Sequence, residues 1–351
     1  MGVEGKMEEN KPLAPFTTFG IGGLARWFVE ARSEGEAVDA VGWARGRGVP
    51  LFVLGGGSNL LVADAGFDGL VLKVGLRGVN VDPAVPGLYR AAAGEDWDAF
   101  VERAVQDGCA GVECLAGIPG TVGGTPVQNV GAYGQEVEPV ISSVRAIDLR
   151  EMSFIEFAAT DCGFGYRRSR FNSVDRGRFI VTRVDYRLNP GGAATVEYPD
   201  VQREIARSGL EPTLAEVAGA VRRVRQSKGM MLVEGDPDCR SAGSFFKNPV
   251  LEAGAVRRIA ESSGKAPPTY PAGEDGASHV KVPAAWLIEQ AGFTKGFSLG
   301  AAGISSRHTL ALINRGGATA AEILALAGRI SEAVWDRFGI ELEREPVLLG
   351  F

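Results

Sequence analysis

Two glycine-rich segments and three polar ones hold the residues best suited to chemistry. The first, GGGSN at residues 55–59, follows the apolar run 51–54. Glycines let the backbone approach an anion closely, and successive N–H groups form an anion-binding nest. The spacing is neither GxGxxG opening a helix nor GxxxxGK[ST], so it supports neither a Rossmann NAD site nor a P-loop. The segment predicts phosphate contact or a plain tight turn.

The second glycine-rich segment, residues 117–134, reads GIPGTVGGTPVQNVGAYG. Six of its residues offer surfaces to a flat ligand: Ile118, Pro119, Gly123, Gly124, Gln128 and Asn129. The Ile-Pro pair offers an apolar wall, the glycine pair removes side chains, and the amides supply donors and acceptors for a heteroaromatic edge. The alternative is a structural loop, but loops this long are usually functional or disordered, and this one is too apolar for disorder.

The polar candidates are an arginine cluster, a serine and a glutamate. YRRSRF at 166–171 contains an arginine able to clamp a carboxylate, unless it is only a solvated turn. Ser244 stands between a glycine and two phenylalanines, where it can donate a proton or be purely structural. The segment Glu343-Arg344-Glu345 near the C-terminus offers a carboxylate, or only a charge on an exposed strand face. With no metal cluster or histidine base, this set suits a cofactor that performs redox work while the protein polarises and protonates.

Composition excludes several classes of protein. The 351 residues are 45% hydrophobic and 23% charged, which is typical of a globular chain and not of a disordered or fibrous one. The net charge of −6 argues against nucleic-acid partners. Only two histidines, His279 and His308, leave little for a metal site or a histidine triad. We expect no bound metal.

The cellular location is also predicted from composition. No run approaches the roughly 18 apolar residues of a membrane-spanning helix, and the polar N-terminus lacks a signal-peptide core. The four cysteines lack CxxC spacing and are expected to be reduced. We therefore expect a soluble cytoplasmic protein without membrane insertion.

The elements that must position these residues follow from periodicity and capping signals, and their mixed order predicts an α+β fold. Strands are expected at 26–31, 51–54, 70–74, 143–149, 179–188, 310–314 and 340–349. Helices are expected at 97–106 and 284–290 and after the capping boxes Ser33/Glu36, Thr213/Glu216 and Thr319/Glu322. Residues 264–278 are rich in proline and glycine and predict a surface loop.

Seven blocks together resemble the UDP-N-acetylenolpyruvoylglucosamine reductase (MurB) family. They are TTFGIGG (17–23), LGGGSNLL (54–61), GIPGTVGGTPVQNVGAYG (117–134), YRRSRF (166–171), AGSFFKNP (242–249), PAAWLIEQAGF (283–293) and LEREPVLLG (342–350). They occur in the family's order over nearly the whole chain. Tyr198 and the block QNVGAYG resemble the subfamily with a tyrosine-bearing substrate loop.

The resemblance implies an FAD-binding fold of the vanillyl-alcohol-oxidase type, made of two α+β sub-domains, plus a smaller α+β substrate domain. Residues 1–78 with the C-terminal strand 346–351 would form the first FAD-binding sub-domain. Residues 79–228 would form the second, and residues 229–345 would bind the UDP-sugar. We expect a monomer.

The resemblance also implies non-covalent FAD as cofactor and NADPH as hydride donor. The expected FAD contacts are Gly55, Gly56, Gly57, Ser58, Asn59, Ile118, Pro119, Gly123, Gly124, Gln128, Asn129 and Gly131. The expected contacts to the UDP-sugar are Tyr198, Lys228, Asn248 and Gln290.

The implied reaction reduces UDP-N-acetylglucosamine enolpyruvate to UDP-N-acetylmuramate in peptidoglycan precursor synthesis. Hydride passes from FAD N5 to C3 of the enolpyruvyl group, and Ser244 gives a proton to C2. Arg167 and Glu345 resemble the pair that stabilises the enolate, which requires a raised pKa at Glu345. The chain departs from the family at Val347, where an arginine is common, and Arg344 is a candidate replacement. The segment between Lys228 and Ser244 is longer than in the shortest members.

Two other functions compete with this hypothesis. A flavin oxidase of the same fold is disfavoured because such enzymes often link flavin covalently through histidine, and neither histidine lies in the glycine-rich segments. A catalytically silent nucleotide-sugar binder is disfavoured because Arg167, Ser244 and Glu345 are all present.

Overall fold

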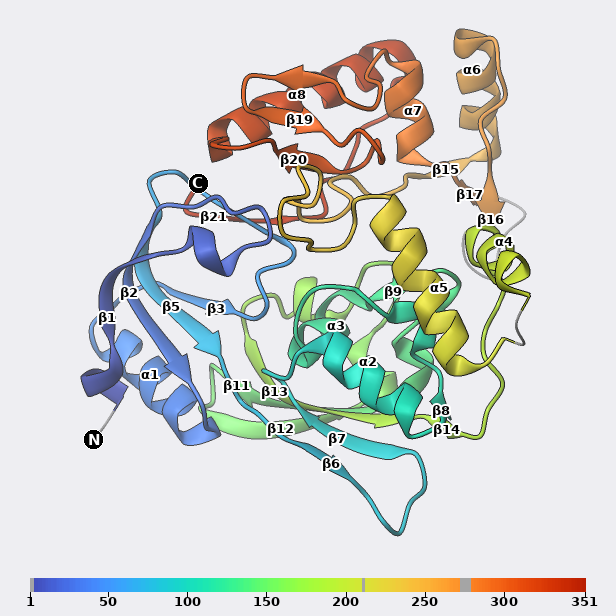
Figure 1. Ribbon diagram of the computed structural model, residues 1–351. Helices are drawn as coiled ribbons and strands as arrows, with labels where there is room; N and C mark the ends of the chain where they lie inside the picture. The colour runs from blue at the N-terminus through green and yellow to red at the C-terminus, as the bar shows by residue number, and fades with distance from the viewer. Residues whose placement is uncertain (1–2, 210–211, 272–278) are drawn as a thin grey trace. The chain divides into compact units, whose positions relative to one another are not determined.

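The computed structural model describes residues 3–209, 212–271 and 279–351 (Figure 1). Backbone contacts divide the chain into two units. Unit 1 comprises Met1–Lys11, Ala25–Gly57 and Phe67–Ser227. Unit 2 comprises Pro12–Leu24, Ser58–Gly66 and Lys228–Phe351. Two short N-terminal segments thus belong with the C-terminal third, although the sequence analysis assigns them to the first sub-domain. The functional roles of the three predicted regions remain a prediction.

Unit 1 begins with a four-stranded sheet in the order β1-β2-β5-β3. Its strands are β1 (Glu8–Pro12), β2 (Leu24–Ala31), β5 (Phe67–Val74) and β3 (Leu51–Leu54). Both β2 and β3 run parallel to β5, and α1 (Glu34–Gly46) connects them and packs against β5. The Ser33 hydroxyl accepts the Glu36 N–H at 3.2 Å, so the expected cap forms. The Glu36 carboxylate instead accepts the N–H of Arg32.

The second sheet of unit 1 has five strands in the order β12-β11-β13-β7-β6. They are β12 (Ser153–Ala158), β11 (Ile141–Asp148), β13 (Phe179–Arg187), β7 (Leu88–Ala92) and β6 (Val79–Val81). Helix α2 (Trp97–Gln106) has the predicted bounds. The ring of Phe100 lies 4.7 Å from that of Tyr186 in β13 and 5.8 Å from that of Tyr89 in β7. This aromatic cluster buries α2 on the sheet.

Shorter elements complete unit 1. They are β8 (Cys109–Ala110), α3 (Thr125–Gln128), β9 (Gly131–Ala132), β10 (Gln135–Glu136), β14 (Asn189–Pro190), α4 (Pro199–Ser208) and α5 (Leu214–Ser227). Helix α5 follows the expected cap, since Glu216 N–H donates to the Thr213 hydroxyl at 3.2 Å. Helix α4 was not predicted, because its N-cap residue makes no side-chain capping bond and most of its residues are polar.

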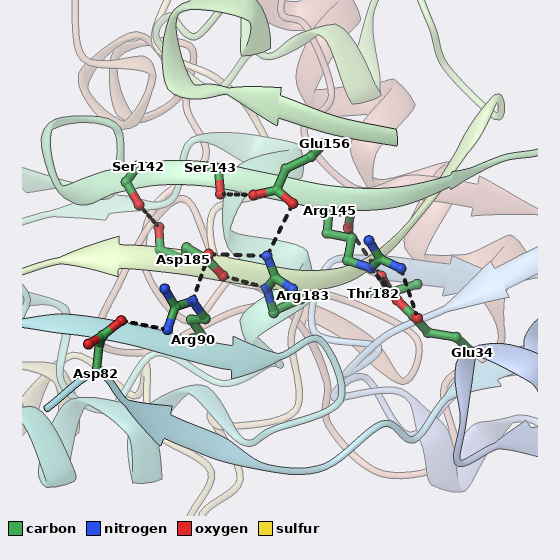
Figure 2. Close-up of polar contacts among 10 residues, drawn as sticks. All are labelled: Glu34, Asp82, Arg90, Ser142, Ser143, Arg145, Glu156, Thr182, Arg183 and Asp185. Carbon is green, nitrogen blue, oxygen red and sulfur yellow. Dashed lines mark hydrogen bonds and ion pairs between the residues drawn. The ribbon is translucent and has the colours of Figure 1, made fainter. Parts of the chain in front are cut away.

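A charged network crosses one face of the five-stranded sheet (Figure 2). Arg145 on β11 and Arg183 on β13 are cross-strand partners, and like charges in that position repel. Each is therefore paired with a carboxylate: Arg183 Nε donates to Asp185 at 2.6 Å, and Arg145 Nε donates to Glu34 at 2.8 Å. The Thr182 hydroxyl also donates to Glu34 at 2.7 Å. Because Glu34 opens α1, these bonds join the helix to the second sheet.

Unit 2 is a smaller α+β body. Its strands are β4 (Leu60–Val62), β15 (Val250–Glu252), β16 (Tyr270–Pro271), β17 (His279–Lys281), β18 (Ser298–Leu299), β19 (Ala302–Ile304), β20 (Leu312–Asn314) and β21 (Val347–Leu349). Its helices are α6 (Ala253–Ser263), α7 (Ala284–Gln290) and α8 (Ala320–Phe338). Figure 1 shows α8 beside β19 and β20, and it contacts both.

Helix α8 has the N-terminal cap, the C-terminal glycine and the apolar face that the sequence predicted. The Thr319 hydroxyl accepts the Glu322 N–H at 3.1 Å, and the Glu322 carboxylate accepts the Thr319 N–H at 2.9 Å, which completes the capping box. Gly339 ends the helix with φ +65°. The four apolar residues that were expected on one face are all buried: Ile323, Leu326, Ile330 and Val334.

Three expectations for unit 2 differ from the structure. The strand predicted at 340–349 is regular only over Val347–Leu349, since Pro346 lacks an N–H and residues 343–345 pair elsewhere. Helix α6 was not predicted. The predicted loop 264–278 begins directly after α6, at its C-cap Gly264, and contains β16, and its residues 272–278 lie outside the described residues. Within the described residues, no helix is both long and apolar enough to cross a membrane.

The Glu34 network gives a testable pH dependence. Burial raises the pKa of Glu34, but hydrogen bonds from Arg145 and Thr182 outweigh it, so the pKa lies below its ordinary value. This stabilisation is complete above the unfolded pKa of about 4.3 and is lost as pH falls through the folded value. We expect Glu34→Gln to lower the free energy of unfolding by about 1 kcal/mol at pH 7. This difference from wild type should become smaller below about pH 4, where Glu34 is protonated.

The matched control is Asp68→Asn, which removes an exposed ion pair with Arg26. Its effect should stay within about 0.5 kcal/mol, as for most surface pairs. Denaturant unfolding at several pH values measures both variants. The interpretation is contradicted if the difference in free energy of unfolding between wild type and Glu34→Gln stays constant down to about pH 3. It is also contradicted if Asp68→Asn lowers the free energy of unfolding by the same amount.

Candidate active site

The two glycine-rich segments touch through their backbones in unit 1. A Cβ built on Gly56 would lie 2.5 Å from Gly120 Cα and 2.8 Å from Gly120 C, closer than any side chain can approach. Only glycine fits at position 56. The turn after β3 and the second glycine-rich segment therefore form one continuous backbone surface.

A buried hydroxyl lies where these segments meet. The Thr121 Oγ1 atom is buried and has no hydrogen-bond partner among the residues that the structure describes. It lies 3.1 Å from the position of a Cβ on Gly55. Buried hydroxyls are almost always bonded, so this one indicates a partner that the protein does not supply. The sequence analysis missed Thr121, although a hydroxyl next to Gly120 in this segment was the available signal.

The glycine pair at 123–124 serves two purposes. A Cβ on Gly123 would lie 2.6 Å from the Cβ of Ala93, so this glycine permits close packing inside the protein. A Cβ on Gly124 would meet nothing within 4 Å. Only Gly124 leaves open space of the kind predicted for both. Ile118, Pro119 and Gln128 are half-buried, and their contacts to a ring remain a prediction.

Arg167 is held on the backbone of the second glycine-rich segment. It lies in a tight turn closed by reciprocal hydrogen bonds of 3.0 Å between Gly165 and Arg168, with a left-handed φ of +53°. Its guanidinium Nη2 donates to the Gly131 carbonyl at 2.6 Å. A Cβ on Gly131 would lie only 3.3 Å from Arg167 Nη1. Glycine at 131 thus permits this close approach, and the guanidinium is fixed.

Asn129 connects the Arg167 turn to the same segment. Its side chain is buried, and Nδ2 donates to Glu136 at 2.8 Å and to the Gly165 carbonyl at 3.1 Å. Its Oδ1 accepts the Glu138 N–H at 3.2 Å. The amide expected to face a ring is therefore engaged with the protein, and a cofactor contact at Asn129 must use its backbone.

Charged side chains from two helices, of which Arg225 is buried, fix the start of this segment at Gly117. Asp98 accepts the Gly117 N–H at 2.6 Å and pairs with Arg222 at 2.8 Å. Arg225 Nε donates to the Gly117 carbonyl at 3.0 Å. Burial lowers the pKa of the Arg225 guanidinium. The sequence analysis did not identify these supports, because Asp98 and Arg225 lie on helices that are distant in sequence from the segment.

The segments that contain Ser244 and Glu345 are neighbours within unit 2. The Glu345 N–H donates to the Phe245 carbonyl at 2.9 Å, so the serine and glutamate segments run side by side. Asn59 Nδ2 donates to the Glu345 carbonyl at 3.1 Å and supports the same strand. Ser244 and Glu345 are half-buried, and Arg344 is exposed. The pairing was not predicted, because it joins segments separated by most of unit 2.

The four predicted substrate residues are distributed over both units. Tyr198, in unit 1, is 40% exposed, and its ring lies edge-on to Tyr133 at 5.2 Å. Lys228 follows α5 and is half-buried. Asn248 Oδ1 accepts the Ala284 N–H at 2.9 Å and so caps α7, while the backbone carbonyl of Gln290 accepts a bond from Arg337. Their contacts with a ligand remain a prediction.

Comparisons with known proteins agree with this geometry. A family model described as FAD binding domain matches residues 25–151, and one described as UDP-N-acetylenolpyruvoylglucosamine reductase, C-terminal domain, matches residues 236–349. The chain is 46% identical to the reductase of that name from Thermobifida fusca over 352 residues, covering 97% of each chain. It is also 46% identical to the reductase of that name from Streptomyces coelicolor over 348 residues, covering 97% of this chain and 89% of the other. The crystal structure of the Thermus caldophilus MurB reductase superposes with a TM-score of 0.65 at 27% identity, covering 98% of each chain.

The matched family models, the full-length relatives and the mixed α and β structure define an FAD-dependent oxidoreductase, as the sequence analysis predicted. The residues present fit the cofactor: the buried Thr121 hydroxyl has no partner among the described residues, and the two glycine-rich segments present side-chain-free backbone beside it, as a phosphate-bearing group would require. The chain belongs to the UDP-N-acetylenolpyruvoylglucosamine reductase (MurB) family.

The contact at Gly56 makes a prediction about flavin retention. We expect Gly56→Ala to weaken FAD binding by about tenfold or more, because overpacking a close contact typically costs about 1–3 kcal/mol. Fluorescence titration of the apoprotein and the visible flavin absorbance per mole of purified protein measure this effect.

The control is Gly42→Ala in the middle of α1, where a Cβ meets nothing within 4 Å. It should keep full FAD content and raise the free energy of unfolding by roughly 0.5–1 kcal/mol, because glycine is a poor helix former. Unchanged FAD affinity in Gly56→Ala would show that this contact does not shape the cofactor site.

Proposed function

We propose that this chain reduces UDP-N-acetylglucosamine enolpyruvate to UDP-N-acetylmuramate with NADPH as donor, a step of peptidoglycan precursor synthesis. The pairing of the Ser244 and Glu345 segments carries the proposal, because an acid and a carboxylate are needed together at one carbon atom. The names of the full-length relatives support the substrate. We further propose a cytoplasmic enzyme that acts as a monomer.

Addition of a hydride and a proton across the enolpyruvyl double bond completes the reaction. FAD, when bound, would supply the hydride chemistry, with NADPH as the donor and C3 of the enolpyruvyl group as the acceptor. The electron pair of the double bond then resides at C2 and spreads into the carboxylate as an enolate. A proton from Ser244 forms the C2–H bond and is replaced from solvent, so C3 becomes a methyl group and the net reaction consumes one hydride and one proton.

Arg167 is suited to bind the substrate carboxylate. Its guanidinium is already fixed on the Gly131 carbonyl by a left-handed turn, so little reorganisation is needed when charge develops. Glu345 assists the enolate when it carries or shares a proton. Its backbone is fixed at both ends, because its N–H donates to Phe245 and its carbonyl accepts from Asn59.

The remaining predicted residues would hold the UDP-sugar. Lys228 offers a point charge and Tyr198 a hydroxyl to the diphosphate. Asn248 retains its amide Nδ2 for the substrate, because its Oδ1 is the atom that caps α7. Gln290, at the end of the same helix, offers a second amide.

Ser244→Ala separates the two half-reactions. The variant should keep reduction of the flavin by NADPH within about twofold and slow its reoxidation by the enolpyruvyl UDP-sugar by about 10²-fold or more, the usual contribution of a positioned acid. Anaerobic stopped-flow absorbance of the flavin measures each step.

The matched control is Ser262→Ala on α6, whose hydroxyl bonds only to the local Ile259 carbonyl among the described contacts. It should leave both half-reactions unchanged. If Ser244→Ala lowers the rates of flavin reduction and flavin reoxidation by the same factor, Ser244 is not the proton donor. If NADPH is consumed at the same rate with oxygen and without the UDP-sugar, an oxidase replaces the proposed reductase.

A further inference from the structure

A fully buried carboxylate lies beneath the segment that leads to Tyr198. Glu113 is 0% exposed and accepts hydrogen bonds from three donors. They are the Gly111 N–H at 2.7 Å, the Thr195 N–H at 2.9 Å and the Gln135 Nε2 at 2.8 Å. A buried carboxylate is costly unless such donors surround it, so this cluster holds its members firmly in place.

Gln135 extends the cluster in two directions. It is 9% exposed, and its Nε2 also donates to the Thr195 hydroxyl at 3.0 Å. Its Oε1 accepts the Cys114 N–H at 2.8 Å. The Cys114 thiol donates to the Thr195 carbonyl at 3.2 Å, and burial raises its pKa to about 12, so it stays protonated. The N–H, carbonyl and hydroxyl of Thr195 are all bonded to this cluster.

This attachment is unusual for its position in the chain. Residues 192–197 have no regular secondary structure and lead directly into the exposed Tyr198. A second attachment is the edge-on ring contact between Tyr198 and Tyr133. Tyr133 and Gln135 both belong to the hairpin of β9 and β10, and Tyr133 has a left-handed φ of +51°.

The same hairpin holds the catalytic arginine. Gly131, at the start of β9, accepts the Arg167 guanidinium through its carbonyl. One short element therefore contacts Arg167 at one end, Tyr198 through Tyr133 at its turn, and Thr195 through Gln135.

We propose that Glu113 and Gln135 are positioning residues that hold the Tyr198 segment in place for binding of the UDP-sugar. The β9–β10 hairpin fixes the position of this segment relative to Arg167. This proposal rests on the proposed function. A segment already ordered before binding avoids the entropy cost of ordering it with the ligand. Losing the anchor should therefore weaken substrate binding and leave flavin reduction intact.

Gln135→Glu tests the anchor with little change in shape. It places a carboxylate against Glu113 and removes the amide that donates to Thr195. We expect KM for the enolpyruvyl UDP-sugar to rise by about tenfold or more, as expected for unpaired buried polar groups. FAD content, the flavin spectrum and the rate of flavin reduction by NADPH should stay within about twofold of wild type. The control, Gln106→Glu on the exposed face of α2, should change none of these.

A milder pair of variants tests the anchor if Gln135→Glu does not fold. Thr195→Val removes only the hydroxyl and should raise KM by about two- to fivefold, in line with one neutral hydrogen bond. Thr195→Ser keeps the hydroxyl and should restore the wild-type KM. The positioning role is overturned if KM is unchanged in Thr195→Val. It is also overturned if the rate of flavin reduction by NADPH falls by the same factor as substrate binding.

Amide hydrogen exchange of residues 193–198 distinguishes this proposal from the proposed function. Failure of the wild type to turn over the UDP-sugar would defeat the proposed function alone. In that case, amide exchange at residue 195 that is faster in Thr195→Val than in the wild type, with unchanged exchange at residues 117–128, still supports the anchor. Unchanged exchange at Thr195 overturns it.

Discussion

The close approach of Gly56 to Gly120 is the steric constraint on which the candidate site depends. Because a Cβ at position 56 would lie 2.5 Å from the facing Cα, two segments far apart in sequence present bare backbone side by side. That contact also encloses the Thr121 hydroxyl and leaves it without a protein partner in the described part of the chain. The glycines at these two positions therefore have a specific structural role: they let the two backbones touch, and side-chain-free backbone of this kind suits a phosphate-bearing cofactor.

Polar side chains of the candidate site are held on the backbone of the second glycine-rich segment. Asn129, Tyr133 and Arg167 all have left-handed backbones, with φ of +42°, +51° and +53°. Such conformations are strained for residues other than glycine, and they persist only where the surroundings enforce them. Here the β9–β10 hairpin and the buried Asn129 amide supply that enforcement. Unit 2 fixes the segments that contain Ser244 and Glu345 through backbone hydrogen bonds between residues 245–247 and 343–345.

Local signals predicted much of the fold, whereas long-range pairing was beyond them. The capping box at Thr319 and the periodicity of α2 identified helices correctly, since both signals depend on near neighbours in the chain. The family blocks identified Arg167, Ser244 and Glu345 as candidates. The predicted closing strand was too long, because the pairing of residues 343–345 with 245–247 is a tertiary contact. Thr121 and Glu113 were missed for a similar reason: their importance comes from burial, which only the fold determines.

The central claim is that backbone-bound flavin, assisted by Arg167, Ser244 and Glu345, reduces an enolpyruvyl UDP-sugar. Anaerobic double-mixing stopped flow on the wild-type protein tests it most directly. NADPH alone should bleach the flavin, and subsequent addition of the enolpyruvyl UDP-sugar, without oxygen, should restore its colour at a rate that accounts for kcat. Flavin that stays reduced until oxygen is admitted, or that NADPH cannot reduce, would contradict the account.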